Sequence, residues 1–342
     1  TEGKKEIPAL GFIAHMDTVS DFCDHEIRPI VTENYDGGDL VLGTSGLVLS
    51  PKEFPHLTGL KGCTLLTSDG TTILGADDKA GIAEILTMIE RIQTENRPHG
   101  TICVAFTPDE EIGMGAEHFN LDQFGAEYAY TLDGDSEGEI QYENFNACKA
   151  EFEIRGFNVH PGEGKDTMIN ASLVAIEINN CLPSMETPRG TEDYEGFYHL
   201  ISMQGEVGEA KLNYIVRDHD KNGFEERKKT LRLIEKNLNA KWGEGTVTLK
   251  ITDQYLNMKE IVEEHMHLID HAKKACEAAG VAPLILPIRG GTDGCQLSFK
   301  GLPCPNLGTG GHAFHGPYEH ISVEGMEKSV ELLLALIQEY TK

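Results

Sequence analysis

Positive charge is scarce in this 342-residue sequence. It contains 29 lysine and arginine residues against 56 aspartate and glutamate residues, which gives a formal net charge of -27. Such an excess of negative charge repels phosphate backbones and anionic lipid headgroups. We therefore expect no nucleic-acid partner and no membrane-surface partner.

The sequence also lacks long apolar runs and cysteine pairs. No segment approaches the roughly 20 apolar residues that a membrane-spanning helix needs, and no signal peptide opens the chain. The eight cysteines form no Cys-x-x-Cys pair and no framework spacing, which is typical of reduced thiols. These absences predict a soluble cytoplasmic protein.

The length suggests two domains, because a chain of this size exceeds a comfortable single core. Nearly continuous apolar runs predict buried strands at 10–15, 101–106 and 128–132. Apolar residues at three-and-four spacing predict a helix at 79–93. Strand, helix and strand in this order indicate a parallel crossover. We expect an α/β domain with a mostly parallel sheet flanked by helices.

A second texture begins near residue 147, where apolar and polar residues alternate strictly and predict strands with one wet face. The predicted elements are a strand from 148, a helix at 169–176, strands at 198–203 and 212–217, a helix at 224–238 and a strand at 247–251. This β-α-β-β-α-β order is the ferredoxin-like arrangement. The α/β pattern of the first domain then returns, with predicted helices at 261–279 and 326–337 and a strand at 284–288. The predicted domains are therefore 1–146 with 257–342, and an inserted domain at 147–256.

Acidic and imidazole side chains recur where the apolar runs stop. They are His15 and Asp17, Asp77 and Asp78, Glu110 and Glu111, Asp133, and His315. His312, three residues before His315, is a further possible ligand, and spacing alone cannot choose between the two histidines. In an open α/β sheet, residues at the carboxyl ends of separate strands converge on one crevice. Imidazole and carboxylate are ligands that zinc accepts, and a bridging carboxylate offsets the repulsion between two cations about 3.5–4 Å apart. The pattern predicts a metal-dependent hydrolase.

Each group has a plainer explanation when it is taken alone. Asp77 and Asp78 also suit the N-terminus of a helix, and Glu110 with Glu111 is an ordinary helix start. Adjacent glutamates nevertheless allow one to bind metal while the other serves as a general base. Only the combination of groups discriminates between these explanations.

Two other stretches imitate known binding loops. Asp133 opens a run like a calcium loop, but Asn144 stands where the closing glutamate belongs. Gly308, Gly310 and Ala313 fit a dinucleotide fingerprint, yet the required strand, turn and helix are absent around them. An oxidoreductase therefore ranks last among the alternatives. A non-enzymatic cation-binding protein is disfavoured because a storage site needs no spare base beside its ligands.

Several blocks together closely resemble the peptidase T family of tripeptide aminopeptidases, in a clan of di-zinc metallopeptidases with carboxypeptidase-type and deacylase relatives. The blocks are GFIAHMDT, LGADDKAGIAE, AFTPDEEIGMGAEHF, LDG with ENFNA, HPG at His160, IRGGTDGCQLSF, and GLPCPN with FHGPYEH. They follow the family's order along essentially the whole chain. The family begins several dozen residues earlier, with a helical segment and a first strand, so we expect such a segment upstream of residue 1.

The resemblance implies a set of metal ligands. One zinc would be held by His15 and Asp133 and the other by Glu111 and His315, with Asp77 bridging both. The expected cofactor is two Zn2+ per subunit.

The resemblance also implies roles for residues that hold no metal. Asp17 supports His15, Glu110 is the catalytic proton acceptor, and His312 receives no metal role. In these enzymes the inserted domain pairs with its copy in a second subunit. A histidine matching His160 there reaches the partner's active site and stabilises the oxyanion. We therefore expect a homodimer formed through the inserted domain.

The expected reaction is hydrolysis of the N-terminal residue from a tripeptide. Arg289 is a candidate clamp for a peptide carbonyl or carboxylate, because a guanidinium presents two parallel donors. Asn213 and Arg217 are further candidates for substrate contact. The alternative is a dipeptidase or an N-acyl amino acid deacylase, which would use the same metals and differ in the inserted domain and the pocket.

Overall fold

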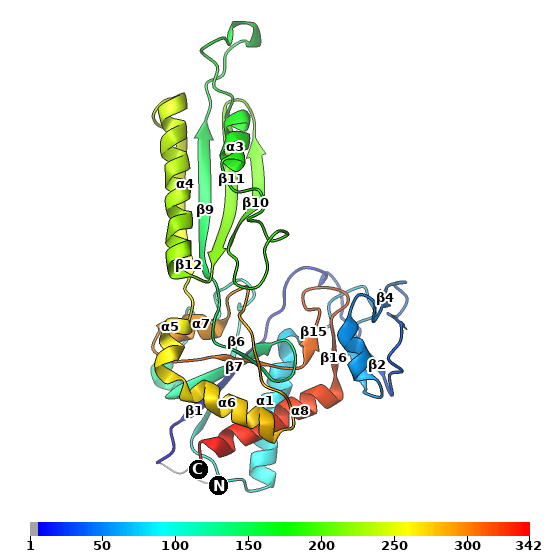
Figure 1. The fold of residues 1–342 in the computed structure, drawn as a ribbon. Helices are drawn as coiled ribbons and strands as arrows, with labels where there is room; N and C mark the ends of the chain where they lie inside the picture. The colour runs from blue at the N-terminus through cyan, green and yellow to red at the C-terminus, as the bar shows by residue number, and fades with distance from the viewer. Residues whose placement is uncertain (1–5) are drawn as a thin grey trace. The chain divides into compact units, whose positions relative to one another are not determined.

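A computed structural model describes residues 6–342 and divides the chain into two units (Figure 1). The outer unit contains residues up to Tyr142 together with Met258–Leu286 and Thr292–Lys342. The inserted unit contains Glu143–Asn257 and also Pro287–Gly291. The sequence analysis placed this last segment in the outer domain. It groups with the inserted unit because Ile288 forms a bridge with Asn144 there.

The outer unit is built on a six-stranded sheet. Its strands, in spatial order, are β13 (Leu284–Ile285), β8 (Glu139–Gln141), β14 (Asn306–Gly308), β7 (Tyr128–Gly134), β1 (Leu10–His15) and β6 (Ile102–Thr107). β1 is parallel to both β6 and β7, and β14 is parallel to β7 but antiparallel to β8. The predicted mostly parallel sheet is confirmed. The strand predicted at 284–288 is shorter than expected.

The central strands β1 and β7 are covered on both faces, which explains why they are mostly apolar. The helices are α1 (Ala76–Thr94), α2 (Leu121–Phe124), α5 (Lys259–Val262), α6 (His267–Ala278), α7 (Asp293–Phe299) and α8 (Val323–Glu339). On one face Phe12 stacks on Tyr130, whose hydroxyl donates to the carbonyl of Leu268 in α6. On the other face Ile13 packs with Leu297 of α7. The single helix predicted at 261–279 is broken into α5, a 3-10 turn at Glu263–His265 and α6.

A smaller sheet lies apart from these layers in the outer unit. Its order is β15 (Gly311–His312), β16 (His320–Ser322), β5 (Leu65–Thr67) and β2 (Ile30–Thr32), and a hairpin of β3 (Leu40–Val41) and β4 (Val48–Leu49) lies nearby in the sequence. Leu42, Leu49, Leu57 and Leu65 form its buried apolar cluster with Tyr35. This sheet fixes both ends of the loop between β15 and β16.

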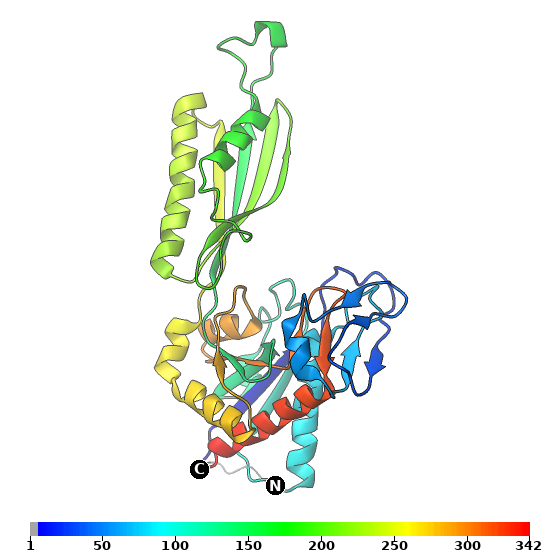
Figure 2. The ribbon, with the colours of Figure 1, turned by 45° about the vertical axis from the view of Figure 1, so that its right-hand side comes forward.

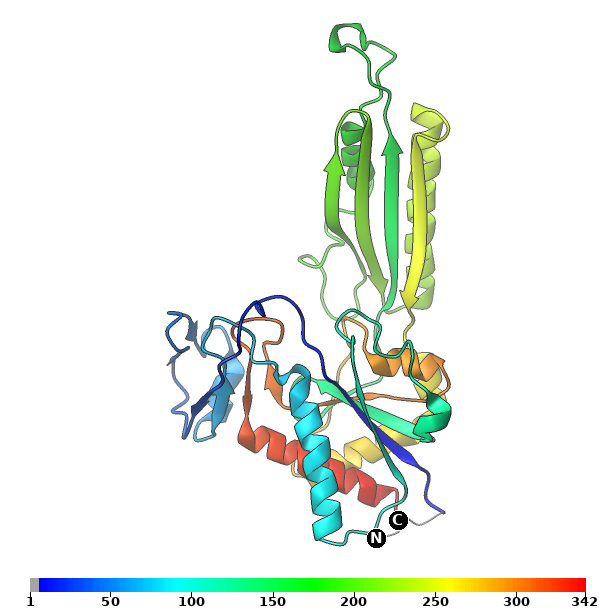
Figure 3. The same ribbon diagram turned by 180° about the vertical axis from the view of Figure 1, so that it is seen from behind.

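The inserted unit has the predicted ferredoxin-like arrangement. Its elements are β9 (Asn146–Arg155), α3 (Ala171–Asn180), β10 (Phe197–Gly205), β11 (Glu209–Asp218), α4 (Lys221–Trp242) and β12 (Val247–Tyr255), with strand order β10-β11-β9-β12 and antiparallel pairing throughout. Phe152 and Ile154 of β9 point into a core shared with both helices. α3 and α4 cover one face of the sheet (Figure 2), and the other face carries no helix (Figure 3).

Within residues 6–342, none of the helices combines the length and the apolar character that crossing a membrane requires.

Candidate active site

The predicted ligands come from five separate places in the outer unit. His15 ends β1, and the parallel register sets it beside Thr107 at the end of β6. Glu111 follows β6, Asp133 lies in β7, and Asp77 lies in the first turn of α1. His315 lies on the loop between β15 and β16. Three of these groups therefore lie at the carboxyl ends of neighbouring strands, where the sheet geometry brings them together.

The five side chains meet in one cluster. The Nε2 atom of His15 lies 2.9 Å from Asp77 Oδ1 and 3.5 Å from Asp133 Oδ1. The Nε2 atom of His315 lies 3.0 Å from Asp77 Oδ2 and 3.2 Å from Glu111 Oε2. The two oxygens of Asp77 thus face two different imidazoles. Each imidazole has a further carboxylate beside it.

This spacing suits two divalent cations. Tetrahedral zinc with bonds of 2.0–2.1 Å separates neighbouring ligand atoms by about 3.3 Å. The four separations between the imidazoles and the carboxylates of the cluster span 2.9–3.5 Å. His15 with Asp133 would hold one cation, Glu111 with His315 the other, and Asp77 would bridge them.

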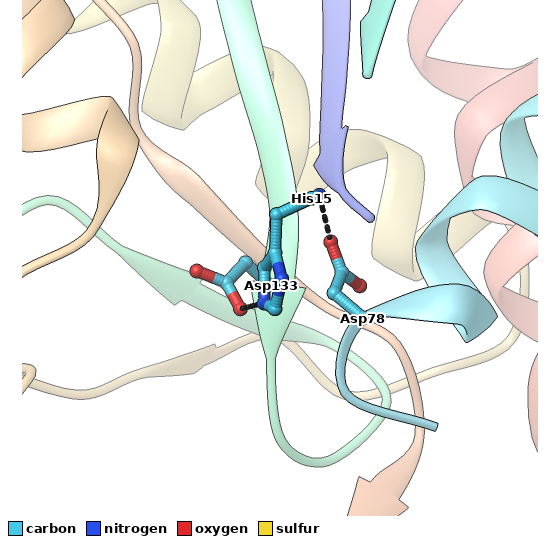
Figure 4. A group of neighbouring side chains, drawn as sticks. All are labelled: His15, Asp78 and Asp133. Atoms are coloured by element: carbon cyan, nitrogen blue, oxygen red, sulfur yellow. Dashed lines mark hydrogen bonds and ion pairs between the residues drawn. The ribbon is translucent and has the colours of Figure 1, made fainter. Parts of the chain in front are cut away.

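Asp78 is also close to His15, and His15, Asp78 and Asp133 form a second group with metal-binding spacing (Figure 4). Its Oδ2 accepts the backbone N–H of His15 at 3.0 Å, and its Oδ1 accepts that of Gly81 at 3.3 Å. Both carboxylate oxygens of Asp78 therefore accept backbone N–H groups, whereas both oxygens of Asp77 face imidazoles. We therefore interpret Asp78 as a residue that fixes the backbone at the end of β1.

Asp17 connects the end of β1 with the loop that follows β6. Its Oδ1 accepts the backbone N–H of Glu110, and its Oδ2 accepts that of Glu111, both at 3.1 Å. The ring Nδ1 of His15 lies 3.1 Å from the Asp17 carbonyl and 3.4 Å from its Oδ1. One carboxylate thus orients the imidazole and both glutamates.

The two glutamates are placed differently. The Glu111 carboxylate contacts His315 and accepts the backbone N–H of Val19 at 3.2 Å. Burial raises the pKa of Glu110 to about 9, and the charge of nearby Asp133 adds to this rise. Burial likewise raises the pKa of Asp133 to about 7. Without a cation these acids hold protons, and bound cations would offset their charge.

The imidazoles hold protons for a related reason. Burial alone would lower the pKa of His15, but hydrogen bonds to Asp133 and Asp77 outweigh it and raise the pKa to about 12. Hydrogen bonds to Asp77 and Glu111 raise the pKa of His315 to about 10. Neutral imidazole is the form that binds metal, so cations that bind at this cluster would displace protons.

His312 packs against two other histidines, whereas His315 contacts Asp77 and Glu111. The His312 ring stacks on that of His56 with centroids 3.9 Å apart, and the ring of His320 lies 5.4 Å away. Burial and these two imidazoles lower the pKa of His312 to about 3. Spacing along the sequence alone left His312 and His315 equivalent, and the structure places only His315 at the cluster.

The remaining predicted residues lie in the inserted unit. His160 is exposed and caps a 3-10 turn at Pro161–Glu163, where its Nδ1 accepts the backbone N–H of Gly162 at 3.2 Å. Because Nδ1 acts as the acceptor, the ring proton of the neutral form is on Nε2. Asn213, on β11, donates to Ser202 Oγ at 2.8 Å.

The two arginines are engaged within the inserted unit. Arg289 lies over the rings of Phe145 and Phe197 and donates to the carbonyls of Asp193 and Glu195. Its other terminal nitrogen donates to Thr191 Oγ1 at 3.0 Å. Arg217 donates to the carbonyl of Arg289 at 3.2 Å. A substrate clamp at Arg289 would therefore have to exchange these loop carbonyls for a peptide.

Sequence reasoning missed two buried residues that support the cluster. Asn306 of β14 accepts the backbone N–H of Asp133 at 3.0 Å and donates to Gln141 at 2.6 Å. Asp293, 2% exposed, is close enough for its charge to help raise the pKa of Glu110. Both lie in sequence blocks that carry the family resemblance. Their position in these blocks was therefore the only available signal.

Comparison with known proteins identifies the family of this chain. The chain matches the model of Peptidase family M20/M25/M40 over residues 71–339. It is 52% identical over 342 residues to Peptidase T of Caldanaerobacter subterraneus subsp. tengcongensis, covering 99% of this chain and 83% of that protein. It is 55% identical over 339 residues to Peptidase T of Clostridium perfringens, with the same coverage.

A solved structure extends the agreement to three dimensions. The aminopeptidase PepT from Bacillus cereus superposes with a TM-score of 0.79 at 26% identity, covering 99% of this chain and 82% of that chain. Sequence, fold and the clustered ligands therefore lead to one assignment. The chain belongs to peptidase family M20/M25/M40 and, within it, groups with the peptidase T proteins.

Proposed function

We propose that this protein is a metal-dependent aminopeptidase that releases the N-terminal residue of tripeptides. The observation that carries the proposal is the position of Asp77, whose two oxygens face the imidazoles of His15 and His315 at 2.9 and 3.0 Å. Glu110 lies next to this cluster and is free of the ligand set. The similarity to proteins named Peptidase T and to aminopeptidase PepT supports the substrate class.

We propose two Zn2+ ions as the cofactor, because the donors are imidazole and carboxylate groups with tetrahedral spacing. When bound, the two cations would supply Lewis acidity, which polarises the scissile carbonyl and lowers the pKa of the attacking water.

Proton transfer is the task of Glu110. Asp17 fixes its backbone. Burial raises the pKa of Glu110 in the metal-free protein, and bound cations would favour its ionised form, which can take a proton from water. The same group then returns this proton to the leaving amine. For His160, the ring proton on Nε2 is available to donate to the oxyanion that forms during attack.

The inserted unit supports the proposed homodimer. β10 is an edge strand of its sheet and exposes Ile201 by 54% and Met203 by 40%. On α3, Leu173 is 62% exposed and Ile176 is 46% exposed. Apolar side chains gathered on an edge strand and a neighbouring helix are typical of a surface that a second copy covers. We propose Arg289, Asn213 and Arg217 as the substrate contacts of this unit.

Dimerisation can be tested by placing a charge on the exposed edge strand β10. We expect Ile201→Arg to convert a dimer into monomers, as measured by light scattering on a sizing column. Lys211→Ala provides the control, because Lys211 is exposed on β11 and pairs with Glu153 on the same sheet. A monomeric unsubstituted protein, or a dimeric Ile201→Arg variant, would contradict the proposed interface.

A cytoplasmic location is part of the proposal. All eight cysteines are unpaired, and Cys148, Cys276, Cys295 and Cys304 are buried. Burial raises the pKa of Cys148 to about 12, which keeps that thiol protonated and unreactive.

A substrate panel tests the function. We expect the zinc-loaded protein to hydrolyse tripeptides faster than dipeptides or N-acyl amino acids. Glu110→Gln should lower kcat by about 10²–10⁴-fold, the usual contribution of a general base, while two cations remain bound. Preferential cleavage of N-acyl amino acids would support the deacylase alternative instead. Loss of the cations in Glu110→Gln would show that Glu110 is a ligand and not the base.

A further inference from the structure

Glu319 forms a cluster of hydrogen bonds that the proposed mechanism does not use. Its side chain is 1% exposed and lies just before β16. Oε2 accepts the backbone N–H groups of Leu74 and Gly75 at 2.6 and 2.8 Å, and Oε1 accepts that of Asp77 at 3.0 Å. One buried carboxylate thus accepts three backbone N–H groups within residues 74–77, more than 240 residues away in the sequence.

These donors lie at the start of α1, which has no N-cap side chain and is not helical at Asp77. Gly75, at the N-cap of α1, has a φ of +77° and offers no side-chain cap. Asp77 has a φ of -82° and a ψ of 104°, which lie outside the helical region. The helix ladder therefore does not fix the backbone of Asp77. Glu319 takes part of the role that an N-cap side chain usually has, since it accepts the N–H of Asp77 in the first turn and those of Leu74 and Gly75 just before it.

Glu319 is itself held on both sides. Its own N–H donates to the carbonyl of Gly316 at 3.1 Å. The next residue, His320, is fully buried, and its ring contacts the carbonyl of Tyr318 at 2.7 Å and His56 Nε2 at 2.8 Å. β16 then pairs with β5. The carboxylate therefore has a fixed position before any ligand binds.

We propose that Glu319 is a positioning residue for the bridging carboxylate, holding the Asp77 backbone so that its two oxygens face His15 and His315. This inference rests on the proposed two-cation site. His315 lies on the same short loop, four residues before Glu319. The loop between β15 and β16 thus supplies His315 to the cluster. Through Glu319 it also holds the backbone of Asp77, the residue that faces both His15 and His315.

Metal affinity in a Glu319→Gln variant tests the proposal. In glutamine, one carboxylate oxygen is replaced by an NH2 group, which cannot accept a hydrogen bond from a backbone N–H. At least one hydrogen bond to residues 74–77 is therefore lost. Loss of a partner that orients ligands typically lowers metal affinity by about 10–100-fold. We expect a loss of this size for Zn2+, measured by chelator competition. With Co2+, the visible absorption of the bound ion should also change.

Glu324→Gln is a matched control. Glu324 also accepts a backbone N–H, that of Thr64 at 2.8 Å, but lies in the first turn of α8 and has no bond to residues 74–77. We expect it to bind Zn2+ and Co2+ as the unsubstituted protein does. A folded Glu319→Gln variant with unchanged affinity and an unchanged Co2+ spectrum would overturn the proposal.

Hydrogen exchange on the unsubstituted protein gives a second test that does not depend on the variant folding. In the metal-free protein we expect the amides of Leu74, Gly75 and Asp77 to exchange as slowly as those inside α1. Rapid exchange there would overturn the proposal. Neither readout requires hydrolysis, so a protein that binds two cations but cleaves no tripeptide would refute the proposed function and leave Glu319 tested separately.

Discussion

The two units of the chain treat buried charge in opposite ways. In the inserted unit, buried cations have acidic partners: Arg227 donates to Asp218 at 2.7 Å, and Lys228, 5% exposed, pairs with Asp253 at 3.1 Å. In the outer unit, buried carboxylates crowd together with imidazoles as their main basic neighbours. Buried charge must be paired or neutralised. The inserted unit carries its own counter-charges, whereas the site of the outer unit takes protons or cations from solution.

Matched substitutions at Asp218 and Asp77 test this difference between the units and should have the largest effects. Asp218→Asn leaves Arg227 with a weakened partner inside the inserted unit, and breaking such a buried pair costs about 3 kcal/mol or more. Its cation content should stay at two. Asp77→Asn should lose cation binding and turnover.

The same pair of variants should differ in stability. Without metal, Asp77→Asn should change the free energy of unfolding less than Asp218→Asn does, because Asp133 and Glu111 still face the imidazoles. Urea denaturation and metal analysis of both variants measure the two effects. Two cations in Asp77→Asn, or their loss in Asp218→Asn, would show that the units are not separated in this way.

The same contrast explains which parts of the molecule could be predicted from sequence. The long strands and helices of both units carry enough residues to show a period, so the mostly parallel sheet and the ferredoxin-like order were found. In the smaller sheet, β16 and β15 contain three and two residues. No alternation can appear over so few positions, and the smaller sheet was therefore missed.

The ligands were predicted because acids and imidazoles are rare at the ends of apolar runs and because the family blocks contain them. The partners of Glu319, Asn306 and Asp78 are backbone N–H groups, which every residue except proline carries. Such contacts leave no mark in sequence spacing. The proposed metal ligands were therefore visible in the sequence, while the groups that hold them in place required the structure.

The smallest expected effect is the dependence of metal binding on pH. The pKa of about 12 for His15 and about 10 for His315 means that both imidazoles carry a proton at pH 7 in the metal-free protein. Cations bind the neutral rings, so binding must release these protons, and affinity should fall as the pH is lowered. Calorimetric titrations in two buffers with different ionisation enthalpies would measure the number released.

The inserted unit offers no comparable exchange of protons for cations. The pKa values of Arg227 and Lys228 are raised, so both side chains keep their charge and their acidic partners at and below pH 7. The proton release should therefore disappear in Asp77→Asn and persist in Asp218→Asn. Equal binding enthalpies in the two buffers would mean that no protons are released. The imidazoles would then already be neutral, and the acids of the outer unit would not depend on solution for their counter-charge.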